Sequence, residues 1–244
     1  MRTLQQPLFT PDTEWVPPDR LPDLSSHKEI AIDLETRDPN LMTMGSGAVR
    51  RDGEVVGIAV AVEGWSGYFP IGHEGGGNMD RALVLDWFEE LLQTTSTKIF
   101  HNAMYDVSWI RSLGFYINGG IIDTMVAASI CDENRFSYTL DSVGKDYIGM
   151  RKNESLLREA AKDWEVNPKA EMWRLPAPFV GEYAEKDAEI TLKLWQALQH
   201  EISKQDLWNV FNLETNLFPC LVDMKFKGVR VDVEKAAALK TQLT

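Results

Sequence analysis

Strand-like and helix-like patterns alternate along most of this chain, and this alternation constrains its fold more than any other feature. The predicted strands cover residues 30–36, 55–62, 67–71 and 98–101, and the predicted helices cover residues 80–92, 103–113 and 179–203. Elements that alternate in this way pack as a sheet covered by helices, because each helix buries its apolar stripe on a face of the sheet. The sequence therefore predicts an α/β layer fold.

Three segments of different character divide the chain. Residues 1–27 contain several prolines and little periodicity, which predicts an N-terminal arm rather than a packed element. Residues 28–205 hold the alternating strands and helices, with a glycine-bearing loop at residues 37–53, and form the expected main domain. From residue 206 to residue 244 the pattern becomes a helical stripe, followed at residues 227–232 by a predicted helix end, a short strand and the cap of a new helix.

Composition excludes some functions and weighs against others. With 244 residues, 44% of them hydrophobic, the chain can bury a full core. It has no run of about 18 apolar residues and no signal-like amino terminus, so we expect a cytoplasmic protein without a membrane partner. The formal net charge of −12 weighs against tight nucleic-acid binding, because phosphate backbones are usually bound by basic surfaces. Taken alone, an acidic balance is more typical of a solvated surface.

Two carboxylates share one face of the first predicted strand. A period of two places Ala31, Asp33 and Glu35 together, opposite a face that carries Ile30 and Ile32. Exposed strand faces often carry acidic residues, so this pair alone is weak evidence for a site. It gains weight only if other carboxylates converge on it.

Two predicted helices also carry a carboxylate on the side that should face the core. Asp106 shares its stripe with Ile110 and other apolar residues, and Asp187 interrupts the apolar stripe of the long helix, one turn after Tyr183. No Lys or Arg lies on these helix faces, and a buried carboxylate without a partner is costly. We therefore expect another cation to neutralise them; the alternative for Asp106 is a solvated acid at the border of its helix.

Together these four carboxylates predict a metal site. Ligands that are rich in oxygen and free of sulfur suit Mg²⁺ or Mn²⁺. Two such ions about 4 Å apart, bridged by a shared acid, activate a water molecule and stabilise the leaving oxygen of a phosphodiester. The residues therefore point to phosphodiester hydrolysis.

Three short motifs resemble those of a known family. The segments Asp33-Leu34-Glu35-Thr36, His101-Asn102-x-x-x-Asp106 and Tyr183-x-x-x-Asp187 are similar in order and spacing to the motifs of the DEDD 3′-to-5′ exonucleases. The tyrosine resembles the tyrosine subclass, because the histidine subclass would carry its histidine where this chain has Glu182. Residues 211–232 are similar to the junction between the exonuclease and polymerase domains of family A DNA polymerases, particularly those of phages.

The resemblance implies a ribonuclease-H-like α/β fold, with a mixed β-sheet flanked by helices, and two divalent metal ions, Mg²⁺ or Mn²⁺. Asp33 would bridge both ions, and Glu35 and Asp187 would complete the first site. Asp106 would hold the second ion, directly or through water. Tyr183, together with Glu35, would orient the attacking water.

The resemblance also suggests contacts to the nucleic-acid strand. Thr36 would offer its backbone N–H to the terminal nucleotide, and Asn102 would contact the strand, with a helix N-cap as its alternative role. Among the aromatic residues, Tyr105 is a candidate to stack on a base, with Phe100, Trp173 and Phe179 as alternatives. Leu41, with Met42 and Met44 as alternatives, is a candidate wedge against the terminal base. The basic residues available to phosphates, each more often a plain surface charge, are Arg50, Arg51, Arg111, Arg151, Lys152, Arg174 and Lys186.

The function implied by the resemblance is a proofreading exonuclease. It would hydrolyse phosphodiester bonds at single-stranded DNA 3′ ends and release nucleoside 5′-monophosphates, beside a polymerase domain in the same or a separate chain. If the protein is phage-encoded, it would work in the host cytoplasm. The alternatives are an RNA-trimming 3′ exonuclease of the ribonuclease D type, which shares all three motifs, and a catalytically inactive domain that only binds nucleic acid. The polymerase-like junction favours DNA, and the complete set of acids with Tyr183 argues against lost activity.

Overall fold

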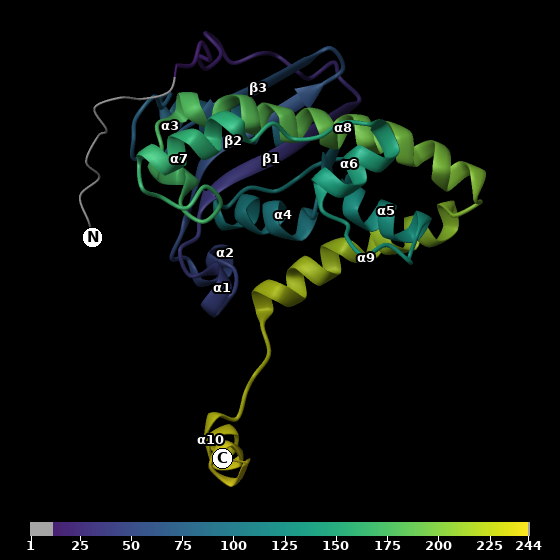
Figure 1. The fold of residues 1–244 in the computed structure, drawn as a ribbon. Helices are drawn as coiled ribbons and strands as arrows, with labels where there is room; N and C mark the ends of the chain where they lie inside the picture. Colours follow the sequence, from purple (N-terminus) through teal and green to yellow (C-terminus); the bar gives the residue numbers. More distant parts are fainter. Residues whose placement is uncertain (1–11, 244) are drawn as a thin grey trace.

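The computed structural model describes residues 12–243, and its strands and helices follow the predicted alternation (Figure 1). In chain order the elements are β1 (Glu29–Arg37), α1 (Leu41–Met44), α2 (Gly47–Arg50), β2 (Glu54–Val62), β3 (Trp65–Pro70), α3 (Arg81–Gln93), β4 (Thr97–Phe100), α4 (Ala103–Ser112), β5 (Ile121–Asp123), α5 (Thr124–Cys131), α6 (Leu140–Ile148), α7 (Ser155–Asp163), the 3₁₀ turns η1 (Met172–Arg174) and η2 (Ala177–Phe179), α8 (Gly181–Lys204), α9 (Trp208–Lys227) and α10 (Val233–Leu243).

The five strands form one mixed sheet in the order β3-β2-β1-β4-β5, which confirms the expected architecture. β1 is central and pairs antiparallel with β2 on one side and parallel with β4 on the other. The pairing with β4 covers only residues Glu29 to Ala31, so β4 leaves the carboxyl-terminal half of β1 unpaired on that edge. This free edge determines where the functional side chains gather.

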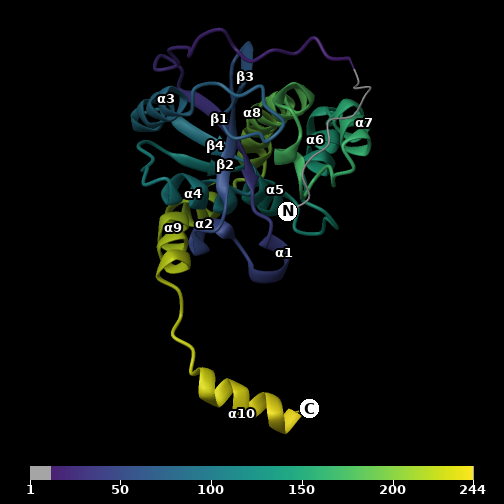
Figure 2. The same cartoon turned by 90° about the vertical axis from the view of Figure 1, so that its left-hand side faces the viewer.

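Helices cover the two faces of the sheet in separate layers (Figure 2). α8 lies across one face, where its alanine and leucine side chains pack on Ala31 and on small residues of β2. α3, α4 and α9 cover the opposite face and pack against Ile30 and Ile32. The period of two inferred from the sequence is therefore correct, and it places Asp33 and Glu35 beneath α8.

Several local expectations need correction. The predicted glycine-bearing loop at residues 37–53 contains two short helices, α1 and α2, with Gly47 N bonded to the Asp38 carboxylate (2.9 Å). The prediction of a short strand after Lys227 was wrong: α9 ends at Lys227 with Gly228 as its C-cap (φ +70°), and residues 229–232 pair with no described strand. A lone extended segment gains no ladder hydrogen bonds, so its apolar pattern does not make it a strand.

The structure describes the expected N-terminal arm from residue 12 onward, and this segment packs against α8 and β3 although an unpacked arm was predicted. Residues 12–27 form no helix or strand. Nevertheless, the Trp15 indole N–H donates to the Glu185 carboxylate on α8 (2.9 Å), and its ring contacts Tyr68 on β3. Gly181, at the start of α8, allows the Trp15 ring to approach this closely, because a Cβ at that position would overlap the ring. Residues 1–11 of the expected arm lie outside the described part.

The last two helices bury little surface. Phe211, Phe218 and Val222 of α9 are buried, whereas Leu213 and Leu217 of the predicted stripe are exposed. α10 has no buried residue and stands apart from the sheet and its helices (Figure 1). Within the described part of the chain, no helix combines the length and apolar character needed to span a bilayer.

Candidate active site

The four predicted carboxylates gather around the free edge of β1. Asp33 and Glu35 project from β1 toward α8, Asp187 points down from α8, and Asp106 reaches in from α4. Asp106 and Asp187 are each 3% exposed and Glu35 is 8% exposed, whereas Asp33 is half-buried. Four acids from three elements therefore share one largely buried region, as the sequence predicted.

Asp106 is held in the core by the main chain of β1. Its Oδ1 accepts a hydrogen bond from the backbone N–H of Leu34 (3.0 Å), a donor that β4 leaves unpaired because β4 ends earlier. Burial raises the pKa of Asp106 well above its usual range, and the nearby charge of Asp33 raises it further. The alternative of a solvated acid at the helix border is therefore wrong, because the side chain lies inside the protein.

Asp33 is the electrostatic centre of the group. Burial raises its pKa to about 7, with a further contribution from the Asp187 carboxylate, while Lys152 opposes the shift. The charge of Asp33 also raises the pKa of Glu35, after burial, and the pKa of Asp106. Like charges this close need a cation between them when all are ionised.

Lys152 supplies part of that positive charge, although its sequence context suggested only a surface residue available to phosphates. Lys152 comes from the segment between α6 and α7, and its ammonium group forms an ion pair with Asp187 Oδ2 and donates to Tyr183 Oη (3.2 Å). No basic residue lies on the α8 face itself, as expected, but the expectation that Asp187 lacks any basic partner was wrong. Residues 35 positions apart cannot be paired from helical periodicity.

Tyr183 lies one helical turn before Asp187 on α8, in the arrangement that the motif predicted. Burial raises the pKa of its hydroxyl, and the charges of Asp187, Glu35 and Asp33 raise it further. The phenol therefore stays protonated and remains available as a hydrogen-bond donor beside the carboxylates.

The donor set suits divalent ions, although it is not closed around one. Within residues 12–243, no three His, Cys, Asp or Glu side chains converge tightly enough to hold a metal ion as they stand. Asp187 Oδ1, however, is buried without a hydrogen-bond partner, and one lysine cannot balance four carboxylates. A buried oxygen without a partner, among donors that are all oxygen atoms, suits Mg²⁺ or Mn²⁺.

The predicted nucleic-acid contacts fall into two groups. Thr36 and Tyr105 come together, with 2.5 Å between their hydroxyl oxygens, and the Tyr105 ring packs edge-on against Trp109. Burial raises the pKa of Tyr105 to about 12. Leu41 on α1 is 37% exposed, and Asn102 is exposed at the start of α4.

Asn102 does not cap α4 with its side chain, which corrects its alternative role. Its φ is +66°, a left-handed conformation, and no side-chain cap bond forms. The Asp123 carboxylate at the end of β5 accepts instead from the backbone N–H groups of Asn102 (3.0 Å) and Ala103 (2.8 Å), while also capping α5 through Met125 (2.8 Å). Asp123 thus caps two helices, α4 and α5.

Comparison with known proteins identifies the family. A family model described as 3′-5′ exonuclease matches residues 12–203. The DNA-directed DNA polymerase of Pseudomonas phage M6 is 39% identical over 243 residues, covering 96% of this chain and 37% of the phage protein. The chain therefore spans well under half the length of that relative.

Solved structures agree on the fold. Brucella melitensis NrnC with bound Mg²⁺ has a TM-score of 0.58 at 18% identity, covering 84% of this chain and 89% of that one. Escherichia coli RNase D, an exoribonuclease involved in structured RNA processing, has a TM-score of 0.54 at 18% identity, covering 84% of this chain and 47% of that one. These likenesses confirm the expected ribonuclease-H-like arrangement. With the family model and the phage relative, they show that this chain belongs to the 3′-5′ exonuclease domains of family A DNA polymerases.

Proposed function

We propose that this chain removes nucleotides stepwise from the 3′ end of single-stranded DNA, releasing nucleoside 5′-monophosphates. Its role would be proofreading for a polymerase domain in the same or a separate chain, in the host cytoplasm if the protein is phage-encoded. Two divalent ions, Mg²⁺ or Mn²⁺, would supply an activated water and charge stabilisation for the leaving oxygen. The observation that carries the proposal is the set of four carboxylates centred on Asp33 in a chain of this family.

The proposed roles follow from the positions of the side chains. Asp33 would bridge both ions, because it interacts electrostatically with each of the other three acids. Glu35 and Asp187 would complete the first site beneath α8, and Asp106 would hold the second ion from α4. Tyr183, of the tyrosine subclass, would donate its hydroxyl proton to a hydrogen bond that orients the attacking water, together with Glu35.

The substrate strand would enter beside β1 and α4. Thr36 would offer its backbone N–H to the terminal nucleotide, and Tyr105, whose hydroxyl Thr36 holds, would stack on a base. Asn102 is exposed at the start of α4, where it can reach the strand, and Leu41 on α1 would wedge against the terminal base.

Two rival functions lead to different substrates or none. A ribonuclease D-like activity on RNA 3′ ends is supported only by the shared fold, whereas the DNA polymerase relative is far more similar in sequence. A catalytically inactive binding domain would have no reason to keep four acids buried around one lysine. Buried unpaired charge lowers stability, so its retention favours a metal-dependent function.

Digestion of matched DNA and RNA single strands, each labelled at the 5′ end, tests the proposal. With Mg²⁺ or Mn²⁺ we expect a ladder of progressively shorter labelled DNA, slower shortening of RNA, and no reaction in the presence of a chelator. Immediate release of the label as a mononucleotide would show the opposite polarity, and full activity with the chelator would refute the metal requirement. Faster digestion of RNA than of DNA would support the ribonuclease D-like alternative.

A second measurement addresses proofreading. A mispaired 3′ terminus should be cut faster than a paired one, because freeing a paired terminal base costs a few kcal/mol more. Equal rates on the two termini would leave a general exonuclease rather than a proofreading one.

A further inference from the structure

Lys152 contacts the carboxylate cluster formed by Asp33, Glu35, Asp106 and Asp187, and its position lies outside the family motifs. Its side chain is 17% exposed, and its ammonium group forms an ion pair with Asp187 and bonds to the Tyr183 hydroxyl (3.2 Å). The same group lies 5.0 Å from the centre of the Tyr183 ring. Among the ion pairs formed by described residues, the Lys152–Asp187 pair is the one that includes a member of the carboxylate cluster.

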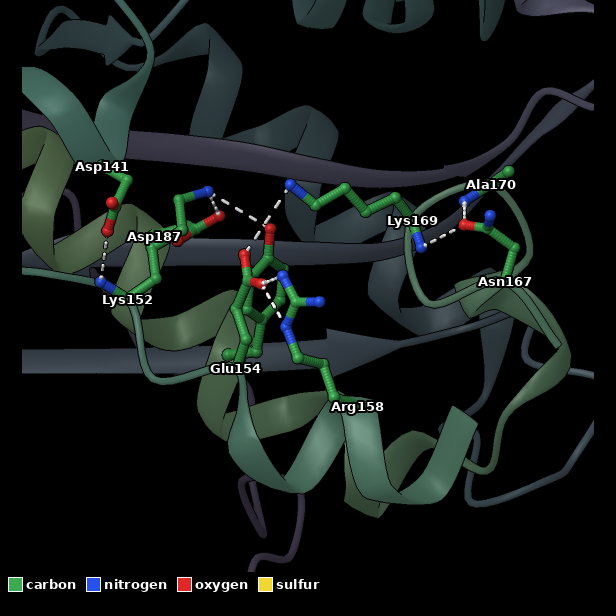
Figure 3. A network of polar contacts seen from close by, with 9 residues as sticks. Asp141, Lys152, Glu154, Arg158, Asn167, Lys169, Ala170 and Asp187 are labelled. Carbon is green, nitrogen blue, oxygen red and sulfur yellow. Dashed lines mark hydrogen bonds and ion pairs between the residues drawn. The ribbon is translucent and has the colours of Figure 1, made fainter. Parts of the chain in front are cut away.

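The segment that carries Lys152 is fixed on both sides of it (Figure 3). The Lys152 backbone N–H donates to Asp141 Oδ1 in the first turn of α6 (3.2 Å). Two residues later, the Glu154 carboxylate pairs with Arg158 on α7 and with Lys169 (3.9 Å). The backbone of this segment is therefore held in place, whereas the long Lys152 side chain can turn toward the carboxylate cluster or away from it.

The ammonium group sits where the carboxylates most need positive charge. Asp187 lies in direct contact, and the charges of Asp33 and Glu35 also act on Lys152. Lys152 engages Asp187 Oδ2 and leaves the buried Oδ1 without a partner. A divalent ion that binds Asp187 must therefore approach a carboxylate already shared with a positive charge, and like charges repel strongly at this depth.

We propose that Lys152 is a built-in counter-ion that competes with the divalent ion for Asp187 and holds Asp187 and Tyr183 in position while the ion is absent. This inference rests on the proposed metal-dependent function. It makes Lys152 a positioning residue with two opposite effects. Its charge stabilises the carboxylate cluster when no metal is bound, and it weakens metal binding. A residue with a purely structural role would not produce that pair of effects.

The test replaces Lys152 by Met, which keeps the length and apolar stem and removes the charge. Mn²⁺ affinity is measured by calorimetry without nucleic acid, and the melting temperature is measured in chelator and in saturating Mn²⁺. Lys152→Met should bind Mn²⁺ about tenfold more tightly, as expected when a like charge close to the ligands is removed. It should also melt at a lower temperature in chelator and gain more from Mn²⁺ than the parent.

Two further variants make the result specific. Lys152→Arg keeps the charge and should bind Mn²⁺ like the parent. Lys169→Met removes a lysine from the same group of polar contacts. The Lys169 side chain is 74% exposed and pairs with Glu154 rather than with an acid of the carboxylate cluster. It should leave Mn²⁺ affinity and metal-free stability unchanged, so a general effect of net charge would show itself here.

The outcomes separate this inference from the proposed function. If the parent binds Mn²⁺ and Lys152→Met binds it equally or more weakly, the inference is overturned and the metal site stands. If the parent binds no Mn²⁺, both fail. Should Lys152→Met be unfolded in chelator, recovery of its folded signal at Mn²⁺ concentrations below those that saturate the parent supports the inference, and absence of recovery at parent-saturating Mn²⁺ overturns it.

Discussion

Asp33 is the residue on which the proposed site depends most, because it interacts electrostatically with all three other acids. Asp33→Ala should abolish calorimetric Mn²⁺ binding and reduce nuclease activity by about a thousandfold or more, since a bridging ligand serves both ions. Parent-like Mn²⁺ binding by Asp33→Ala would show that the bridging role is wrong.

At the same scale, Tyr183 separates orientation of water from binding of metal ions. Tyr183→Phe keeps the ring beside Lys152 and removes only the hydroxyl, so both ions should remain bound while turnover falls about a hundredfold. Calorimetry and single-turnover digestion of the same preparation check this. If metal affinity falls as far as turnover does, Tyr183 contributes to the metal site itself.

At the scale of elements, His73 joins the end of β3 to the segment before α8. Its Nδ1–H donates to the Leu175 carbonyl (2.9 Å), so its Nε2 accepts from the Tyr68 hydroxyl (2.7 Å). Burial lowers its pKa to about 4, despite the bond to Leu175. Because the unfolded chain binds this proton near pH 6.5, the stabilising contribution is complete above that pH and is lost as pH falls toward 4, by roughly 3 kcal/mol in total.

Urea unfolding in chelator at pH 7.5 and pH 4.5 measures this effect when the parent is compared with His73→Gln. The variant should be less stable at pH 7.5, because Gln reproduces the two hydrogen bonds poorly, and the gap should narrow by about 2 kcal/mol at pH 4.5. His101 and the acids of the carboxylate cluster titrate in both proteins, so their contributions to the free energy of unfolding cancel in the comparison. A gap that stays constant between the two pH values would contradict a neutral, buried His73.

At the scale of the whole molecule, the net charge of −12 should make DNA binding weak and dependent on divalent ions. Few basic residues are available to displace counter-ions from the DNA backbone, and the carboxylate cluster repels phosphate until metal ions neutralise it. Anisotropy of a short labelled single strand should rise more steeply with protein when Ca²⁺ is present, and this gain should be absent in Asp187→Ala. Tight binding without metal ions and with a steep salt dependence would favour the binding-domain alternative.

Features that depend on local periodicity can be predicted from the amino-acid sequence. A period of two placed Asp33 and Glu35 on the same face of β1, and helical spacing placed Asp106 and Asp187 toward the core. The cap of α3 is local as well, because the Asp80 carboxylate accepts from the backbone N–H of Leu83, three residues further on (3.0 Å). These patterns are legible because neighbours in a strand or helix are fixed by backbone geometry alone.

Contacts between residues far apart in the sequence depend on how the elements pack. Lys152 reaches Asp187 because the segment between α6 and α7 folds back over α8, and Asp123 caps α4 because β5 lies beside β4. The early end of β4 likewise frees the Leu34 N–H for Asp106. Each of these contacts joins segments whose approach depends on how the layers pack, and no local pattern records that packing.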